Sequence, residues 1–207
     1  MWSEPQLIEK LRGRAGVAPT AGIVLGIGDD CAIVRPRGAR EDWLYTTDML
    51  IEETHFRRAT HGAADVGWKA LARGLSDIAA MGGEARFCLL SLALASWVDA
   101  RWVKGFYDGL LALADRAGAA LIGGDLGRAE RVMCDIVVAG TVPRGKALRR
   151  DGARAGDAIY VSGALGGSAL GLAAGRAGPG RGTSGRNPGW RWGGFCVRAW
   201  LPRRRWI

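Results

Sequence analysis

The spacing of apolar residues alternates between a helical and a strand period along residues 1–143, and this order limits the fold more than any other feature. Helical spacing predicts helices near residues 3–13, 65–81 and 99–118. Short apolar, β-branched or aromatic runs predict strands at 23–25, 32–34, 43–47, 86–95, 119–122 and 131–142. The order α-β-β-β-α-β-α-β-β predicts an α/β (α+β) fold in which helices pack against one mixed β-sheet.

The ends of the expected helices carry residues that favour starting or stopping a helix. Ser3 followed by Gln6 fits a capping box, and Asp99 is a favourable N-cap residue. Gly82-Gly83 supplies a stop after the second helix, and Gly118 follows the third. These positions support the helix boundaries that the apolar spacing predicts.

Acidic residues recur where the chain turns or leaves a strand. The segment GIGDD (26–30) combines turn-forming glycines with adjacent carboxylates, which repel each other unless a cation lies between them or water solvates both. Asp48 is expected at the end of strand 43–47, and Asp125 follows two glycines. Asp77 lies inside a helix beside its apolar face, where a carboxylate without a partner is costly.

Several carboxylates at one edge of a sheet could hold Mg²⁺, which prefers oxygen ligands, and this combination with glycine-rich turns points to phosphate chemistry. The alternatives to metal binding are a solvated turn at 26–30 and a hydrogen-bonded structural carboxylate at Asp77. No Walker A sequence is present, and the only histidines, His55 and His61, argue against a histidine-based hydrolase.

The composition indicates the cellular compartment in which we expect the protein. The four cysteines form no CxxC pair, which argues against zinc or a disulfide framework and fits a reducing cytoplasm. No apolar run approaches the ~20 residues of a membrane span, and the first residues lack the features of an export signal. We therefore expect a cytoplasmic protein without a membrane partner.

The net charge of +9 is concentrated at the end of the chain. Residues 176–207 hold eight arginines and no acidic residue, whereas the other 175 residues carry a net +1. No nucleic-acid partner is therefore expected for the body of the protein. Arginines interleaved with four tryptophans could bind single-stranded nucleic acid, which is one interpretation of this tail.

Five stretches resemble the thiamine-monophosphate kinases, of the superfamily that includes aminoimidazole ribonucleotide synthetase and selenophosphate synthetase. They occur in the family's order and cover roughly residues 3–175. The histidine seven residues after Asp48 favours the thiamine-phosphate branch. The stretches are GIGDDCA (26–32), TTDMLIEETHF (46–56), WKALARGLSDIAAMGG (68–83), LIGGDLGRA (121–129) and KALRRDGARAGDAIYVSG (146–163).

The resemblance implies roles for individual residues. His55 matches a contact to thiamine phosphate, although a surface histidine remains the alternative. Arg150 matches an ATP contact, for which Arg149 is the neighbouring alternative, and Leu126-Gly127 replaces the family's usual hydroxyl residues. The implied magnesium ligands are Asp30, Thr46, Thr47, Asp48, Asp77 and Asp125. The implied nucleotide contacts are Tyr107, Gly124, Asp125 and Arg150.

The implied reaction is direct transfer of the γ-phosphoryl group of ATP to thiamine monophosphate, with several Mg²⁺ ions as cofactors. Because superfamily members form dimers through the sheet of this domain, the resemblance also implies a homodimer. Strands 86–95 and 131–142 are the candidate interface.

We expect three segments: a synthetase-like Mg/ATP-binding domain at 1–143, the start of a truncated second domain at 144–175, and a disordered tail at 176–207. The Arg, Gly and Trp content of the tail is typical of a GC-rich gene read out of frame. The expected function is therefore the kinase, with an activity that we expect to be impaired by truncation. The alternatives are a non-catalytic remnant that binds Mg-nucleotide and a nucleic-acid-binding protein that uses its basic tail.

Overall fold

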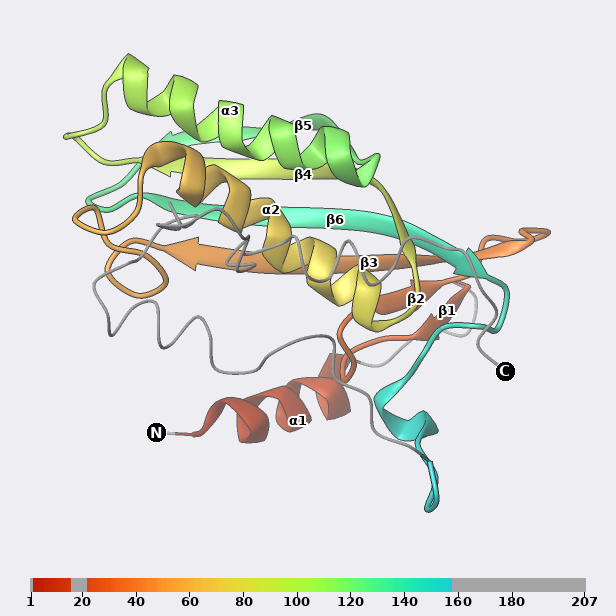
Figure 1. Ribbon diagram of the computed structural model, residues 1–207. Coiled ribbons are helices and arrows are strands. Elements are labelled where there is room, and N and C mark those ends of the chain that lie inside the picture. The colour runs from red at the N-terminus through yellow and green to blue at the C-terminus, as the bar shows by residue number, and fades with distance from the viewer. Residues whose placement is uncertain (1, 16–21, 158–207) are drawn as a thin grey trace.

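The computed structural model describes residues 2–15 and 22–157. Its helices are α1 (Glu4–Ala15), α2 (Ala63–Ala80) and α3 (Ala100–Ala117), and a short 3₁₀ turn, η2, spans Arg150–Gly152 (Figure 1). Its strands are β1 (Ile23–Leu25), β2 (Ala32–Val34), β3 (Glu41–Ile51), β4 (Glu84–Leu94), β5 (Ala120–Arg128) and β6 (Met133–Pro143). The expected order of helices and strands is confirmed.

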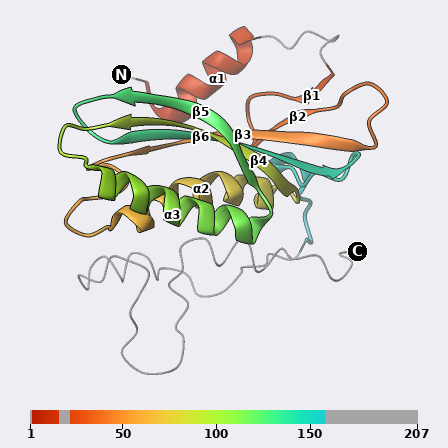
Figure 2. The ribbon, with the colours of Figure 1, turned by 90° about the horizontal axis from the view of Figure 1, so that it is seen from above.

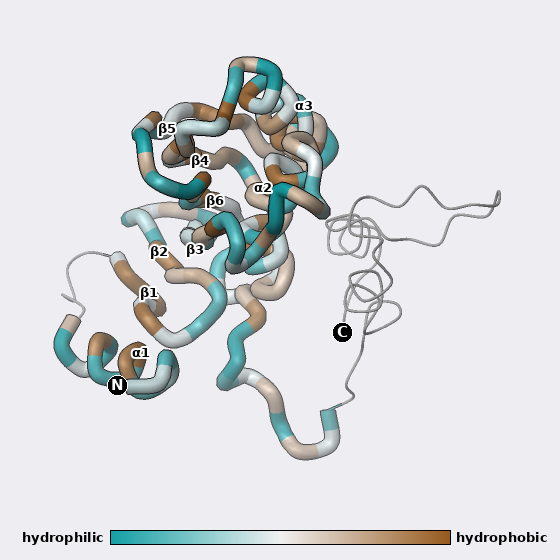
Figure 3. The backbone as a smooth tube through the Cα atoms, turned by 90° about the vertical axis from the view of Figure 1, so that its left-hand side faces the viewer, coloured by the Kyte–Doolittle hydropathy of each residue, from teal (hydrophilic) through white to brown (hydrophobic). Residues whose placement is uncertain are grey.

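The strands form one six-stranded sheet in the order β1-β2-β3-β6-β4-β5. The pair β4–β5 is parallel and the other neighbouring pairs are antiparallel, so the sheet is mixed, as the sequence predicts. Helices α2 and α3 cover one face, called here the inner face (Figure 2). Helix α1 lies beside β1 on the other side, and none of its residues is buried (Figure 3).

The core lies between the inner face and the two covering helices. Phe106 and Leu110 of α3 are fully buried, as are Leu71 of α2 and Leu44 of β3. The two helices cross closely because Gly67 leaves no side chain there: a Cβ at Gly67 would lie 1.9 Å from the Phe106 carbonyl oxygen. The close contact between α2 and α3 fixes the position of α2 over β3. Residues of the candidate site lie on these two elements.

Strand β3 pairs with β6 over eleven consecutive residue pairs without a bulge, from Glu41↔Pro143 to Ile51↔Met133. Side chains alternate between the faces of a strand. Leu44 and Thr46 therefore point to the inner face, whereas Trp43 and Tyr45 point to the opposite, outer face. The Trp43 and Tyr45 rings stack on that face with centroids 6.1 Å apart.

Two expectations about strand ends are wrong. Asp48 lies inside β3 rather than after it, because β6 pairs with the whole of β3. Asp125 lies inside β5, because the strand continues through the glycine pair and stays in parallel register with β4 as far as Leu94↔Arg128. The backbone of both aspartates is thus held by ladder hydrogen bonds instead of lying in loops.

The helix ends agree with their expected caps. The Asp99 side chain accepts a hydrogen bond from the Trp102 N–H at 2.7 Å. Gly118 takes the left-handed conformation that ends α3. The Gln6 side chain accepts from the Ser3 N–H at 3.0 Å, which is one half of the expected capping box.

The segment after β6 is fastened to the sheet. The Gly145 N–H donates to the buried carboxylate of Asp42 at 2.8 Å, and Arg35 holds the same carboxylate through two hydrogen bonds. The Leu148 N–H donates to the Met81 carbonyl at 2.9 Å. Residues 144–157 are thereby led past the β1–β2 loop. The rest of the expected second domain and the basic tail, 158–207, lie outside the described residues.

Candidate functional site

The β1–β2 loop presents two adjacent carboxylates with different surroundings. The side chain of Asp29 is almost fully buried and accepts hydrogen bonds from the N–H groups of Asp30 (2.9 Å) and Arg150 (3.1 Å). Asp29 thus fixes the turn. Asp30 instead points its carboxylate at the Arg150 guanidinium, with which it forms an ion pair.

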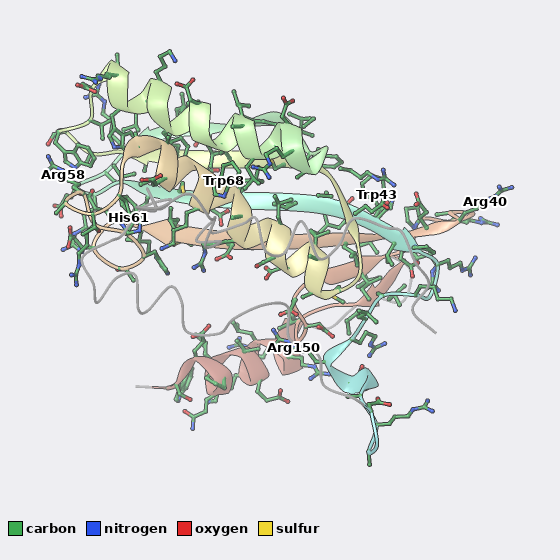
Figure 4. All side chains as sticks on the ribbon, in the orientation of Figure 1. Arg40, Trp43, Arg58, His61, Trp68 and Arg150 are labelled. Carbon is green, nitrogen blue, oxygen red and sulfur yellow. The ribbon has the colours of Figure 1, made fainter. Side chains whose placement is uncertain are left out.

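Arg150, rather than Arg149, faces these acids. Arg149 is engaged by Asp151, with which it forms two hydrogen bonds of 2.9 and 2.6 Å. Arg150 begins η2, and Figure 4 labels it beside the β1–β2 loop. The structure therefore brings Arg150 and Asp30 together across 120 residues of sequence.

A row of polar contacts, called here the α2–β3 seam, joins helix α2 to strand β3 and the loop that follows it. The Thr46 hydroxyl donates to Asp77 at 2.6 Å, and Arg73 Nε donates to Asp48 at 2.8 Å. At the far end, Lys69 Nζ donates to the carbonyl oxygen of His55. Three predicted site residues, Thr46, Asp48 and Asp77, thus meet in this seam.

Asp77, at one end of the seam, lies among other carboxylates that raise its pKa. Burial raises the pKa of the Asp77 carboxyl, and the charges of Asp48 and Asp30 raise it further, against the opposing hydrogen bond from Thr46. Burial also raises the pKa of the Cys31 thiol to about 12, with contributions from Asp77, Asp30 and Asp29. A cation would relieve this repulsion.

His55 has a defined hydrogen-bond state. Its Nδ1 accepts a hydrogen bond from the Ile51 N–H at 3.0 Å. In the neutral ring the proton therefore lies on Nε2, which is a donor. Burial lowers the pKa of His55, and the charges of Arg73 and Lys69 lower it further, so the neutral form is favoured.

A second group of predicted residues lies at the β5 edge of the sheet, in what we call the edge pocket. Its volume is ≈ 600 Å³, and it contains Tyr107, Gly124 and Asp125. The other lining residues are Leu90, Leu121, Gly123 and Leu126. Gly124 is required at its position, because a Cβ there would lie 1.8 Å from the Leu90 carbonyl oxygen.

Two predicted metal ligands are not brought to the seam. The Thr47 side chain lies on the outer face, where its hydroxyl donates to Asp135 at 2.6 Å. Asp125 pairs with Ser91 of β4, and Ser91 pairs with Asp135 of β6, so the register places Asp125 on the outer face as well. Three strand spacings separate β5 from β3, which puts Asp125 about 14 Å from Asp48 across the sheet.

The residues in and beside the seam could hold Mg²⁺ only together with other ligands, such as phosphate oxygens and water. In the described part of the chain, no group of three or more His, Cys, Asp or Glu side chains converges to hold a metal ion by itself. Mg²⁺ is commonly held by one or two carboxylates together with substrate phosphates and water. Asp30, Asp48 and Asp77, which lie close enough to affect one another electrostatically, suit that arrangement.

Residues 28–142 match the family described as AIR synthase related protein, N-terminal domain. The match spans more than half of the chain, which therefore belongs to this family. The fold class and the resemblance expected from the sequence are confirmed.

The curated relatives of this chain include thiamine-monophosphate kinases. The kinase of Escherichia coli (strain K12) is 43% identical over 152 residues, which are 73% of this chain and 45% of the relative. The kinase of Bacillus subtilis (strain 168) is 36% identical over 154 residues, 73% of this chain and 47% of the relative. The solved complex of AaThiL with AMPPCP and TMP has a TM-score of 0.73 and 33% identity, and the match covers 83% of this chain and 52% of that one. This chain spans about half the length of the curated relatives it matches.

Sequence reasoning missed three residues of the site. The buried role of Asp29 in fixing the turn was not predicted, and neither Lys69 nor Arg73 was identified as a candidate. The signal for the last two was present, because Lys69, Arg73 and Asp77 follow one another at four-residue spacing, which places them along one side of a helix.

Proposed function

We propose that this chain carries the magnesium- and nucleotide-binding part of a thiamine-monophosphate kinase. The observation that carries the proposal is that the family match over residues 28–142 contains the α2–β3 seam, in which Asp48 and Asp77 lie with Asp30 close by. The curated relatives of the chain are thiamine-monophosphate kinases. The substrates would be ATP and thiamine monophosphate. The AaThiL complex, which contains AMPPCP and TMP, supports this pair.

In the proposed reaction, a phosphate oxygen of thiamine monophosphate attacks the γ-phosphorus of ATP. The bond from that phosphorus to the β–γ bridging oxygen breaks, and ADP leaves with the bonding electrons, which gives thiamine diphosphate. Such transfers depend mainly on positioning and on neutralising the charge of two anionic reactants. No protein nucleophile is required.

The residues of this chain would divide the work as follows. Asp30, Thr46, Asp48 and Asp77 would hold Mg²⁺, which supplies positive charge to the nucleotide phosphates. Arg150 would bind a phosphate oxygen, since its guanidinium stays charged and can donate two hydrogen bonds. Tyr107, Gly124 and Asp125 would contact the nucleotide at the edge pocket, and His55 would contact thiamine monophosphate. Thr47 and Asp125 lie on the outer face, so we do not include them among the Mg²⁺ ligands of the seam.

Release of ADP tests the proposal directly. The purified chain is incubated with ATP, Mg²⁺ and thiamine monophosphate, and the same mixture without thiamine monophosphate is the control. We expect ADP and thiamine diphosphate in equal amounts. Because the chain spans about half of its relatives, binding without turnover is the second candidate, and calorimetric binding of AMPPCP with no ADP release would favour it.

We further propose that two copies associate through the outer face of the sheet. This face carries the stacked rings of Trp43 and Tyr45, and Phe87 lies 5.9 Å from Trp43 between ring centroids. Tyr45 and Met49 are 38% and 48% exposed, which is unusual for apolar side chains in the middle of a sheet. Thr47 and Asp125 would then lie at the interface between the copies.

Light scattering after gel filtration checks the dimer. We expect twice the mass of the chain, and a monomer for Tyr45→Lys, which places a charge in the aromatic patch. Leu111→Lys is the matched control, because Leu111 is 48% exposed on α3, away from the outer face. A Tyr45→Lys protein that remains dimeric would contradict this interface.

A cytoplasmic location is also proposed. Cys31, Cys88 and Cys134 are free and buried in the described part of the chain, which suits a reducing compartment. None of the helices that the structure describes is long and apolar enough to cross a membrane.

A further inference from the structure

The carboxylate of Asp29 joins the β1–β2 loop to the segment that follows β6. Its side chain is only 5% exposed, and its two oxygens accept from different segments. Oδ1 accepts from the Asp30 N–H at 2.9 Å, and Oδ2 accepts from the Arg150 N–H at 3.1 Å. One buried carboxylate therefore holds the backbones of a predicted metal ligand and a predicted nucleotide contact side by side.

Met81, directly after α2, joins the same two segments at a second point. It is fully buried, its sulfur accepts from the Cys31 N–H at 3.0 Å, and its carbonyl oxygen accepts from the Leu148 N–H at 2.9 Å. Cys31 directly follows Asp30, and Leu148 lies two residues before Arg150. Since all these donors are backbone N–H groups, the main chain is fixed at both positions.

The side chains at these two positions are less enclosed than their backbones. The Arg150 guanidinium forms an ion pair with Asp30, and its Nε lies 3.8 Å from Asp29 Oδ1. The Arg150 side chain is 64% exposed, and the Asp30 side chain is 28% exposed. An exposed arginine can change rotamer while its backbone stays in place. Arg150 can therefore leave Asp30 without a rearrangement of the loop or of η2.

The Asp30 carboxylate can be the partner of either an arginine or a metal ion. Its Oδ1 accepts from the Arg150 guanidinium. Mg²⁺ prefers carboxylate oxygens, and a divalent cation at the same carboxylate would repel the guanidinium. Nucleotide phosphates offer the guanidinium other oxygens, to which it can donate two hydrogen bonds. An exchange of partners therefore leaves both cations paired.

Resting on the nucleotide and metal binding proposed above, we propose that Asp29 is a positioning residue for an exchange at Asp30. Asp30 gives up the Arg150 guanidinium for Mg²⁺, and the released guanidinium moves to a phosphate of the nucleotide. Asp29 keeps the two backbones together, so that the guanidinium is beside the phosphates when it is released. Arg150 thus opposes binding of the metal alone and favours binding of the nucleotide.

Removing Arg150 should affect metal and nucleotide binding in opposite directions. Binding of Mn²⁺, which takes the same oxygen ligands and can be counted as the free ion by EPR, is measured without nucleotide. Binding of AMPPCP with Mg²⁺ is measured by calorimetry. We expect Arg150→Ala to tighten Mn²⁺ binding about two- to fivefold, the range for loss of an ion pair with one exposed partner, and to weaken AMPPCP binding several-fold. A merely structural role of Arg150 predicts no gain in metal affinity.

Two variants control the Mn²⁺ measurement. Arg149→Ala removes the same charge from a neighbouring residue that is paired with Asp151, and it should leave the Mn²⁺ affinity unchanged. Asp30→Asn should weaken Mn²⁺ binding, and in this background Arg150→Ala should bring no gain. An equal gain from Arg149→Ala, or a gain that persists without the Asp30 carboxylate, would assign the effect to net charge and overturn the exchange.

A double-mutant cycle tests the positioning role of Asp29. If Asp29 acts through Arg150, loss of Arg150 should lower AMPPCP affinity much less in the Asp29→Ala background than in the unaltered chain. Melting temperatures verify that the variants fold, and Asp29→Asn, which keeps one acceptor oxygen, replaces Asp29→Ala if the alanine variant does not. Additive effects on AMPPCP affinity would overturn the role of Asp29.

The Mn²⁺ measurement also separates this inference from the proposed function, because it needs no nucleotide. An Mn²⁺ affinity that Arg150→Ala leaves unchanged or lowers overturns the exchange. Failure of the unaltered chain to bind AMPPCP with Mg²⁺ removes the kinase function proposed above and, with it, the phosphate contact of Arg150. AMPPCP binding by the unaltered chain, without the gain in Mn²⁺ affinity in Arg150→Ala, removes only this inference.

Discussion

In the α2–β3 seam, charged and hydroxyl side chains fill the space between a helix and a strand, whereas beside the edge pocket the lack of a side chain at Gly124 lets strand β5 approach strand β4 closely. Arg73, Thr46 and Lys69 each contact a partner across the seam. At the β5 edge, Gly124 lies so close to β4 that only hydrogen fits. The seam is thus defined by electrostatics and the pocket by backbone shape.

This difference predicts how each region responds to substitution. A change in the seam alters charge but leaves the backbone in place, so binding should change more than stability. A change at the pocket glycine displaces strands, so stability and binding should fall together. The predictions below test that distinction, beginning with the largest effect.

Gly124→Ala should be the most damaging substitution. The added Cβ would lie 1.8 Å from the Leu90 carbonyl oxygen, and the φ of +157° is unfavourable for alanine. We expect the free energy of unfolding in urea to fall by about 3 kcal/mol, with loss of AMPPCP binding. Gly127→Ala is the control on the same strand, because a Cβ there meets nothing within 4 Å. Similar midpoints for the two variants would contradict a pocket defined by backbone contact.

Asp77→Asn should separate binding from stability. We expect Mg²⁺-dependent AMPPCP affinity to fall about tenfold or more, since a ligand charge is lost. Because the folded-state pKa of Asp77 is raised, the folded protein binds more protons than the unfolded chain, and this carboxyl lowers stability as pH rises above ~3.8. Asp77→Asn should therefore be as stable as the unaltered chain, or more so, at pH 7. Asp108→Asn on α3 is the control, and a large loss of stability in Asp77→Asn alone would be inconsistent with the seam.

Arg150→Ala should weaken AMPPCP binding several-fold with little change in folding. Its ion pairs with Asp29 and Asp30 are exposed on the arginine side, so their loss should lower the unfolding free energy by less than about 1 kcal/mol. Arg149→Ala, which removes a cation that is paired with Asp151, should leave the affinity unchanged. Equal effects of the two variants would mean that position 150 has no special role.

The smallest effect concerns the titration of His55. Its pKa should lie below the ordinary histidine value, so stability falls as pH decreases below ~6.5, where the unfolded chain takes up the proton more readily. In an NMR titration, Arg73→Gln should move the pKa of His55 upward. His61 is an internal control, because its pKa is lowered by burial and Lys69, with no contribution from Arg73. A His55 pKa that ignores Arg73 would break the link between them.

Much of the fold could be predicted from local patterns. Apolar spacing gave the order of the elements, and Asp99 and Gly118 marked the ends of α3 because caps depend on neighbouring residues alone. The position of Asp125 could not be predicted in this way. It depends on the parallel pairing of β4 with β5, whose partners are 34 residues apart at Ser91↔Asp125.

The site could be predicted only in part, because local patterns show the acidic residues but not their partners in the fold. Asp48 and Asp77 were identified as acids, but which residues neutralise them depends on how α2 crosses β3. Alternation along a strand could have shown that Thr47 points away from Thr46 and Asp48. The hydrogen bond from Lys69 to the His55 carbonyl forms only when the loop carrying His55 folds back against α2, and no short stretch of sequence reports that contact.

The unbroken β3–β6 ladder has a consequence for how this domain can diverge. With eleven successive pairs and no bulge to absorb a shift, loss or gain of one residue within β3 would interchange the two faces beyond that point. Asp48 would turn outward beside the aromatic rings, and Met49 would turn beneath α2. Substitutions in this strand therefore leave its two faces in place, whereas an insertion or a deletion does not.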